Sequence, residues 1–78
     1  MLMNKNVRNR SSKMLEYLLE EIRYAIKENR HRGVTQRSIA SELGITRTHF
    51  ADLLSGKYSM SSDYLIYLIC RFELDKAH

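Results

Sequence analysis

The stretch QRSIASELGITRTHFADL, from Gln36 to Leu53, decides the fold of this chain. Its apolar residues recur at the spacing of two short helices that meet at a sharp angle. Gly44 lies between the two runs, where a tight turn favours glycine, and Ala40 is small where the helices cross. The residues expected to face inward are Ile39, Leu43, Ile45, Phe50 and Leu53. The stretch therefore predicts a helix–turn–helix unit.

Helical spacing continues on both sides of this unit, and no segment alternates as a strand would. We expect a first helix that starts at Ser11 or Ser12, runs to about Asn29 and is followed by a break at Gly33. Its expected apolar stripe is Met14, Leu15, Leu18, Leu19, Ile22, Ala25 and Ile26. Residues 1–11 are predicted to be a flexible basic arm.

Three further helices have recognisable caps. Thr35 is expected to cap a helix over residues 36–43, and Thr46 a helix over residues 47–55 that ends at Gly56. Ser61 or Ser62 is expected to cap a last helix that continues to about Glu73. The predicted fold class is all-α, a small domain of four to five helices over residues 12–74, followed by a tail over 75–78.

Composition limits the class of protein. With 44% hydrophobic residues the chain is not disordered as a whole, and with 28% charged residues it is not a membrane protein. The longest apolar run, Tyr64 to Cys70, is too short to span a bilayer. Cys70 is the only cysteine, which excludes an internal disulfide and favours a reducing compartment, so we expect a cytoplasmic protein.

Positive charge is concentrated in two segments. The first thirteen residues hold four basic residues and no acid, and Arg23 to Tyr58 holds seven bases against three acids. This distribution favours a polyanionic partner. The arm cations that would contribute are Lys5, Arg8, Arg10 and Lys13, although a block of like charge can also be a solvated tail without a partner.

Residues Val34 to Phe72 resemble the lambda-repressor-like (Cro-type) helix-turn-helix family. The resemblance rests on motifs in register: Thr35-Gln36, Ala40, Leu43-Gly44-Ile45-Thr46 and Gly56-Lys57. It implies a regulator that places the helix over residues 47–55 in the DNA major groove, and it implies that Gln36 contacts phosphate. Arg37 and Ser38 stand where that family usually has acids, so its usual ion pair with the first helix is not expected.

Four residues are expected to meet base edges. Helical spacing places Thr48, Ala51 and Asp52 on the face opposite Phe50. Arg47 precedes them and can donate hydrogen bonds to both O6 and N7 of one guanine. The resemblance makes it the best candidate for a base contact. Asp52 is either a specificity filter or the partner of a neighbouring base on its own helix.

Phosphate contacts are expected on both flanks of this helix, where they position the protein without specifying sequence. The candidates are Gln36, Arg37, Thr46, His49, Ser55, Lys57 and Tyr58. Two of these residues also have a structural explanation that needs no DNA. Thr46 can cap the helix that follows it, and Lys57 places a favourable positive charge after the end of that helix.

The last predicted helix carries two apolar stripes. One stripe should face the core and consists of Leu65, Leu68, Ile69 and Phe72. The second stripe would then have nothing to pack against if the helix lay alone on the surface. We interpret it as a homodimer interface; the alternative is that the first helix or the arm covers it within one chain. The interface residues would be Tyr64, Ile66, Tyr67, Cys70 and Leu74.

Catalysis finds no support in the sequence. None of the histidines is spaced with Cys70 as metal ligands are, and no glycine-rich phosphate loop occurs, so no metal and no cofactor are expected. The predicted function is a homodimeric transcription regulator, a repressor that binds a palindromic site in double-stranded DNA. The alternative is an antitoxin-like or adaptor module that uses the same fold to bind a protein partner, a toxin or another regulator.

Overall fold

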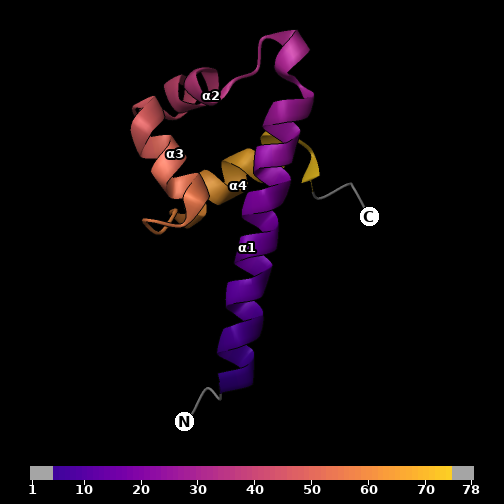
Figure 1. Cartoon of the computed structure of the whole chain (residues 1–78), viewed down its shortest axis with the longest axis vertical. Helices are drawn as coiled ribbons and strands as arrows, with labels where there is room; N and C mark the ends of the chain where they lie inside the picture. The colour runs from indigo at the N-terminus through magenta and orange to yellow at the C-terminus, as the bar shows by residue number, and fades with distance from the viewer. Residues whose placement is uncertain (1–4, 75–78) are drawn as a thin grey trace.

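The computed structural model describes residues 5–74, with side chains from residue 13 onward, and it is all-helical over that range. Four α-helices and one short 3₁₀ helix follow each other along the chain (Figure 1). They are α1 (Lys5–Glu28), η1 (Arg30–Arg32), α2 (Gln36–Leu43), α3 (Arg47–Ser55) and α4 (Ser62–Arg71). The all-α prediction is therefore confirmed.

The boundaries of α2 and α3 agree with the prediction because local caps specify them. The Thr35 hydroxyl accepts a hydrogen bond from the Ser38 amide at 3.0 Å, and the Ser38 hydroxyl accepts one from the Thr35 amide at 2.8 Å. Thr46 caps α3 through the His49 amide at 3.1 Å. Gly44 follows α2 with φ +76°, a left-handed conformation that costs other residues more than glycine.

The predicted start of the first helix is wrong. α1 begins at Lys5, so the segment expected to be a flexible arm is helical from that residue onward. Neither proline nor glycine interrupts residues 5–28, and serines at positions 11 and 12 can lie inside a helix as well as cap one. Residues 1–4, the first part of the expected arm, and the tail 75–78 lie outside the described residues.

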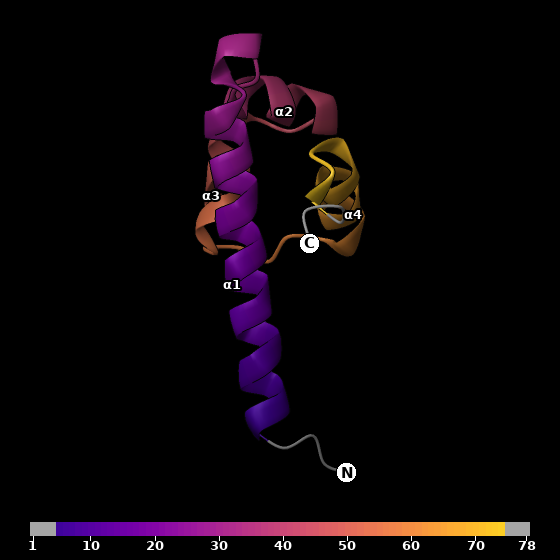
Figure 2. The same ribbon diagram turned by 90° about the vertical axis from the view of Figure 1, so that its right-hand side faces the viewer.

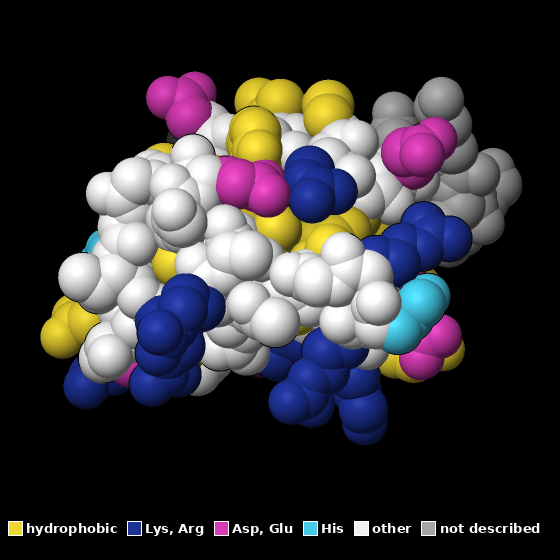
Figure 3. Space-filling model, turned by 90° about the horizontal axis from the view of Figure 1, so that it is seen from above, with side chains coloured by type: hydrophobic (Ala, Val, Ile, Leu, Met, Phe, Trp, Pro, Cys, Tyr) yellow, Lys and Arg dark blue, Asp and Glu magenta, His cyan; other side chains and the backbone are white. Residues whose placement is uncertain are grey.

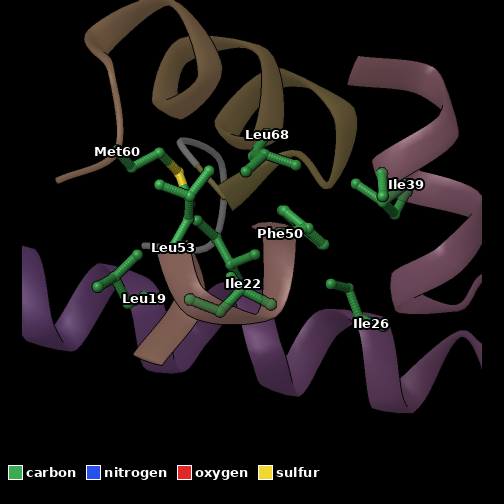
Figure 4. Close-up of a cluster of buried hydrophobic side chains, with 10 residues drawn as sticks. Leu19, Ile22, Ile26, Ile39, Phe50, Leu53, Met60 and Leu68 are labelled. Carbon is green, nitrogen blue, oxygen red and sulfur yellow. The ribbon is translucent and has the colours of Figure 1, made fainter. Parts of the chain in front are cut away.

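The hydrophobic core lies where α1, α3 and α4 meet the end of α2 (Figure 4). Phe50 is fully buried at its centre and contributes the largest of the buried side chains. Residues from four helices surround it: Leu19, Ile22, Ile26, Ile39, Ala40, Leu53, Leu54 and Leu68, with Met60 from the α3–α4 link. All inward-facing residues expected in α2 and α3 are buried or packed against this core, whereas Met60 was not predicted to join it.

The expected apolar stripe of the first helix is wrong at its beginning. Met14 is 71% exposed and Leu15 is also exposed, while Leu19, Ile22 and Ile26 are buried. The cause is the arrangement in space: the N-terminal half of α1 extends beyond the other helices, as two perpendicular views show (Figures 1 and 2). The other helices therefore cover only the later part of the stripe.

The end of α4 also differs from the prediction. α4 stops at Arg71, and Glu73 has φ 54°, a left-handed conformation in which the chain changes direction. As a result Leu74 packs against the core and does not join the expected interface stripe. Tyr64 packs against the core too, because it lies one turn before the buried Leu68 on the same face of the helix.

A polar contact joins α2 to α4 on the surface. Arg71 donates two hydrogen bonds to the Glu42 carboxylate, at 3.1 and 3.3 Å, and the Tyr67 hydroxyl donates a third. Hydrogen bonds from Arg71 and then Tyr67 lower the pKa of Glu42, and the bond to Glu42 raises the pKa of Tyr67.

Within residues 5–74, no helix has the length and apolar character needed to cross a membrane.

Candidate nucleic-acid interface

The outward face of α3 is open to solvent. Arg47 and Thr48 are exposed at its N-terminal end, Ala51 and Asp52 are half-buried along it, and Ser55 is exposed at its C-terminal end. The opposite face is fixed, because Phe50, Leu53 and Leu54 are buried in the core. α3 therefore presents the predicted base-reading residues from a rigid support.

A basic groove lies beside the N-terminal ends of α2 and α3. Residues from α1, η1, α2 and α3 line it, together with Thr35 before α2, and five of the eight lining residues are Lys or Arg. Figure 3 shows Lys and Arg side chains gathered along the lower edge of the molecule. The residues of the basic groove are Arg23, Ile26, Lys27, Arg30, Thr35, Gln36, Arg37 and Arg47.

Two structural features make this groove electropositive. Arg23, Lys27 and Arg30 follow one another at intervals of four and three residues, which aligns them on one side of α1 and its continuation into η1. Gln36 and Arg37 begin α2, where unpaired amide groups and the helix dipole add partial positive charge. With Arg47 added, the groove combines five formal charges with a helix N-terminus, the arrangement that favours a phosphate group.

A second basic and aromatic cluster lies at the other flank of α3. The Lys57 ammonium is 5.6 Å from the centroid of the Tyr58 ring, and the His49 and Tyr58 ring centroids are 6.1 Å apart. All three side chains are exposed. They can donate hydrogen bonds to an anion without losing any contact that the fold requires.

Two predicted phosphate ligands are already engaged within the chain. The Thr46 hydroxyl accepts the His49 amide, and the Ser55 hydroxyl donates to the Asp52 carbonyl oxygen at 2.9 Å. The Ser55 oxygen also accepts from the Lys57 amide at 3.4 Å. Their hydroxyl groups serve first as helix-end contacts, and both residues remain exposed beside α3.

Asp52 is the acidic residue on the outward face of α3. In the part of the chain whose side chains are described, its carboxylate forms neither an ion pair nor a hydrogen bond with a neighbouring base. Of the two interpretations of Asp52, the intrahelical partner therefore gains no support. A free carboxylate on this face repels phosphate and can accept a hydrogen bond from a cytosine amino group.

Of the predicted N-terminal cations, the structure describes the side chain of Lys13, and it does not bring Lys13 to this surface. Lys13 is exposed on the part of α1 that extends away from α2 and α3 (Figure 1), and it lines a different, apolar surface. The side chains of Lys5, Arg8 and Arg10 lie outside those described. The basic groove depends on cations from the other half of α1.

Sequence reasoning assigned no site role to Arg23, Lys27 and Arg30. Their helical spacing was a signal that they share one side, but it did not indicate that this side meets the start of α2. Besides lining the groove, Arg23 contacts α3, because its guanidinium donates a hydrogen bond to the carbonyl oxygen of Leu54.

The described residues contain no metal-binding cluster. No group of three or more His, Cys, Asp or Glu side chains among them could hold a metal ion. Comparison with known proteins gives no further guidance, since no protein-family model, curated protein or solved structure matches the chain.

Proposed function

We propose that this chain is a sequence-specific DNA-binding transcription regulator in which α3 lies in the major groove. The observation that carries the proposal is the basic groove, which joins Arg47 at the start of the exposed α3 face to cations of α1 and α2. A surface that binds DNA needs this combination, because phosphate contacts supply affinity and base contacts supply specificity.

The dimensions of α3 suit the proposal. Nine residues make a helix about 13 Å long, and the major groove is about 12 Å wide and admits one helix. The basic groove lies at one end of α3, and Lys57 and Tyr58 follow its other end. Cations on both flanks can contact phosphates on the two sides of the groove that α3 enters.

The exposed face of α3 supplies different chemistry at each position. The Arg47 guanidinium suits guanine, the Ala51 methyl group suits the methyl of thymine, and the Asp52 carboxylate suits the amino group of cytosine. Thr48 offers both a hydroxyl and a methyl group. The resemblance of residues 34–72 to lambda-repressor-like proteins supports the same role for this helix, and favours a homodimeric repressor that occludes a promoter.

Selection of DNA from a pool of random duplexes tests the proposal. The purified chain should enrich a common motif, and titration should show tighter binding to that motif than to a scrambled duplex of equal length. Arg47→Ala should narrow the difference in affinity between the two duplexes, whereas Ser62→Ala, on α4 and outside the site, should behave as the native chain does. Failure to enrich any motif would contradict sequence-specific binding.

A protein-binding module is the second candidate, and the exposed face of α4 favours it. Ile66 is 59% exposed there, and Tyr67 and Cys70 are exposed beside it. An apolar patch of this kind can bind a protein partner such as a toxin. Loss of a co-purifying neighbouring gene product on Ile66→Glu, with no effect of Arg47→Ala, would favour this function over DNA binding.

A further inference from the structure

α1 carries a second stripe of side chains that the core does not use. Met14, Tyr17, Glu21 and Tyr24 follow one another at alternating intervals of three and four residues, the repeat of a helix that pairs with another helix. Met14 is 71% exposed, Tyr17 is 55% exposed and Tyr24 is 60% exposed. Glu21 is half-buried, and the three apolar or aromatic members of the stripe are open to solvent.

The fold explains why no other described helix packs on this stripe. The core takes the neighbouring stripe of α1, Leu19, Ile22 and Ile26, which is rotated about one third of a turn or more from the first. Beyond the other helices, α1 extends alone (Figure 2). A helix segment of this length is marginal without packing, so a partner that covers this part of α1 would stabilise it, and no described helix does so.

The distribution of charge along α1 indicates which kind of partner would bind this stripe. The same interval, continued toward the N-terminus, passes through Arg10 and Val7. Residues 5–13 contain four basic residues and no acid, whereas residues 14–21 contain Glu16, Glu20 and Glu21 and no base. One half of the helix therefore complements the other half in a second copy placed in the opposite direction.

We infer that two copies of this chain associate through an antiparallel pair of α1 helices. In this arrangement Met14 of one copy meets Tyr17 of the other, a pair formed twice by symmetry, and the basic segment 5–13 of each copy runs beside the acidic segment 14–21 of the other. A parallel pair would instead place acidic segment beside acidic segment and basic beside basic, which like charges oppose. The antiparallel direction follows from this distribution of charge.

An additional pair flanks the stripe. Lys13 and Glu20 each precede a stripe position by one residue, and both are exposed. Between antiparallel helices such flanking positions face each other, so Lys13 of one copy meets Glu20 of the other. The Lys13–Glu20 pair lies at the edge of the proposed interface, so its two charges can be exchanged without disturbing the core. Exchanging them tests whether the two helices run antiparallel.

The inference goes beyond the proposed function and is tested without DNA, by sedimentation equilibrium over a range of protein concentrations. The native chain should dimerise, and Met14→Glu with Tyr17→Glu should leave a monomer. Lys13→Glu or Glu20→Lys alone should each raise the dissociation constant of the dimer roughly tenfold, because two attractive pairs become repulsive. The double reversal, Lys13→Glu with Glu20→Lys, should restore the native value.

Controls separate this interface from others and from misfolding. Ile66→Glu, on the exposed face of α4, should leave the dissociation constant unchanged. Thermal unfolding of the core, followed by circular dichroism, should show that each variant still folds, since every substituted side chain is exposed. A native chain that is monomeric at all concentrations, a dimer that only Ile66→Glu dissociates, or a double reversal that fails to restore association would each overturn the inference.

Discussion

The guanidinium of Arg23 donates a hydrogen bond to the carbonyl oxygen of Leu54 and so joins the C-terminal half of α1 to the last turn of α3. Carbonyl groups at the end of a helix carry partial negative charge, which a cation stabilises. Arg23 also lines the basic groove. One side chain thus holds α3 against α1 and adds charge to the surface beside it.

Arg23→Ala should lower the free energy of unfolding by about 1 kcal/mol, because a part-buried, charge-assisted hydrogen bond is lost. Arg23→Lys keeps the charge but not the guanidinium geometry and should recover part of the loss. Urea denaturation of the two variants and the native chain measures both effects. Equal stability of all three would show that the contact does not hold α3 in place.

Phe50→Ala should be far more damaging, since Phe50 is fully buried at the centre of the core. Removal of a core aromatic ring costs about 3 to 5 kcal/mol, a large share of the stability of so small a domain. Thr48→Ala, two residues away on the exposed face, is the matched control and should change stability by less than about 0.5 kcal/mol. A stable Phe50→Ala variant would contradict the observed core.

The contact of Glu42 with Arg71 and Tyr67 predicts a small pH dependence. Because the pKa of Glu42 is lowered in the folded chain, its contribution is present at neutral pH and is lost as pH falls through the lowered pKa. Glu42→Gln should therefore reduce stability by at most about 1 kcal/mol at pH 7 and by nothing in strong acid. Denaturation of both chains across that range checks the sign; a difference that grows toward acid would contradict it.

Local signals explain which parts of the fold the sequence could predict. Thr35, Thr46, Gly44 and Gly56 act on their own helix ends, so α2 and α3 begin and end where expected. The start of α1 was mispredicted because a serine is compatible with both a cap and a helix interior.

Long-range arrangement explains what the sequence could not predict. The direction in which α1 leaves the core decides that Met14 is exposed, and the turn at Glu73 decides that Leu74 is covered. The basic groove depends on how α1 packs against α3 and where α2 begins, so Lys27 and Arg30 could be counted as charges but not assigned to a surface.

Arg47 provides the test of base recognition. If its guanidinium bonds guanine, Arg47→Ala should cost about 1 to 3 kcal/mol of binding free energy and relax the preference at one base pair in each half-site. Titration of single-base variants of the selected motif measures this loss. Equal weakening on every variant would assign Arg47 to a phosphate instead.

The most direct test of DNA binding through the basic groove is the slope of the logarithm of affinity against the logarithm of salt concentration. The native chain should bind its selected duplex with a steep negative slope, and Arg37→Ala should make that slope shallower by roughly 0.9 for each phosphate contact that is lost. Lys27→Ala should do the same, and Ser62→Ala, on α4 and outside the groove, should leave the slope unchanged. A slope that neither groove substitution alters would contradict a phosphate contact in the groove, and the absence of measurable binding to any duplex would contradict the proposed function.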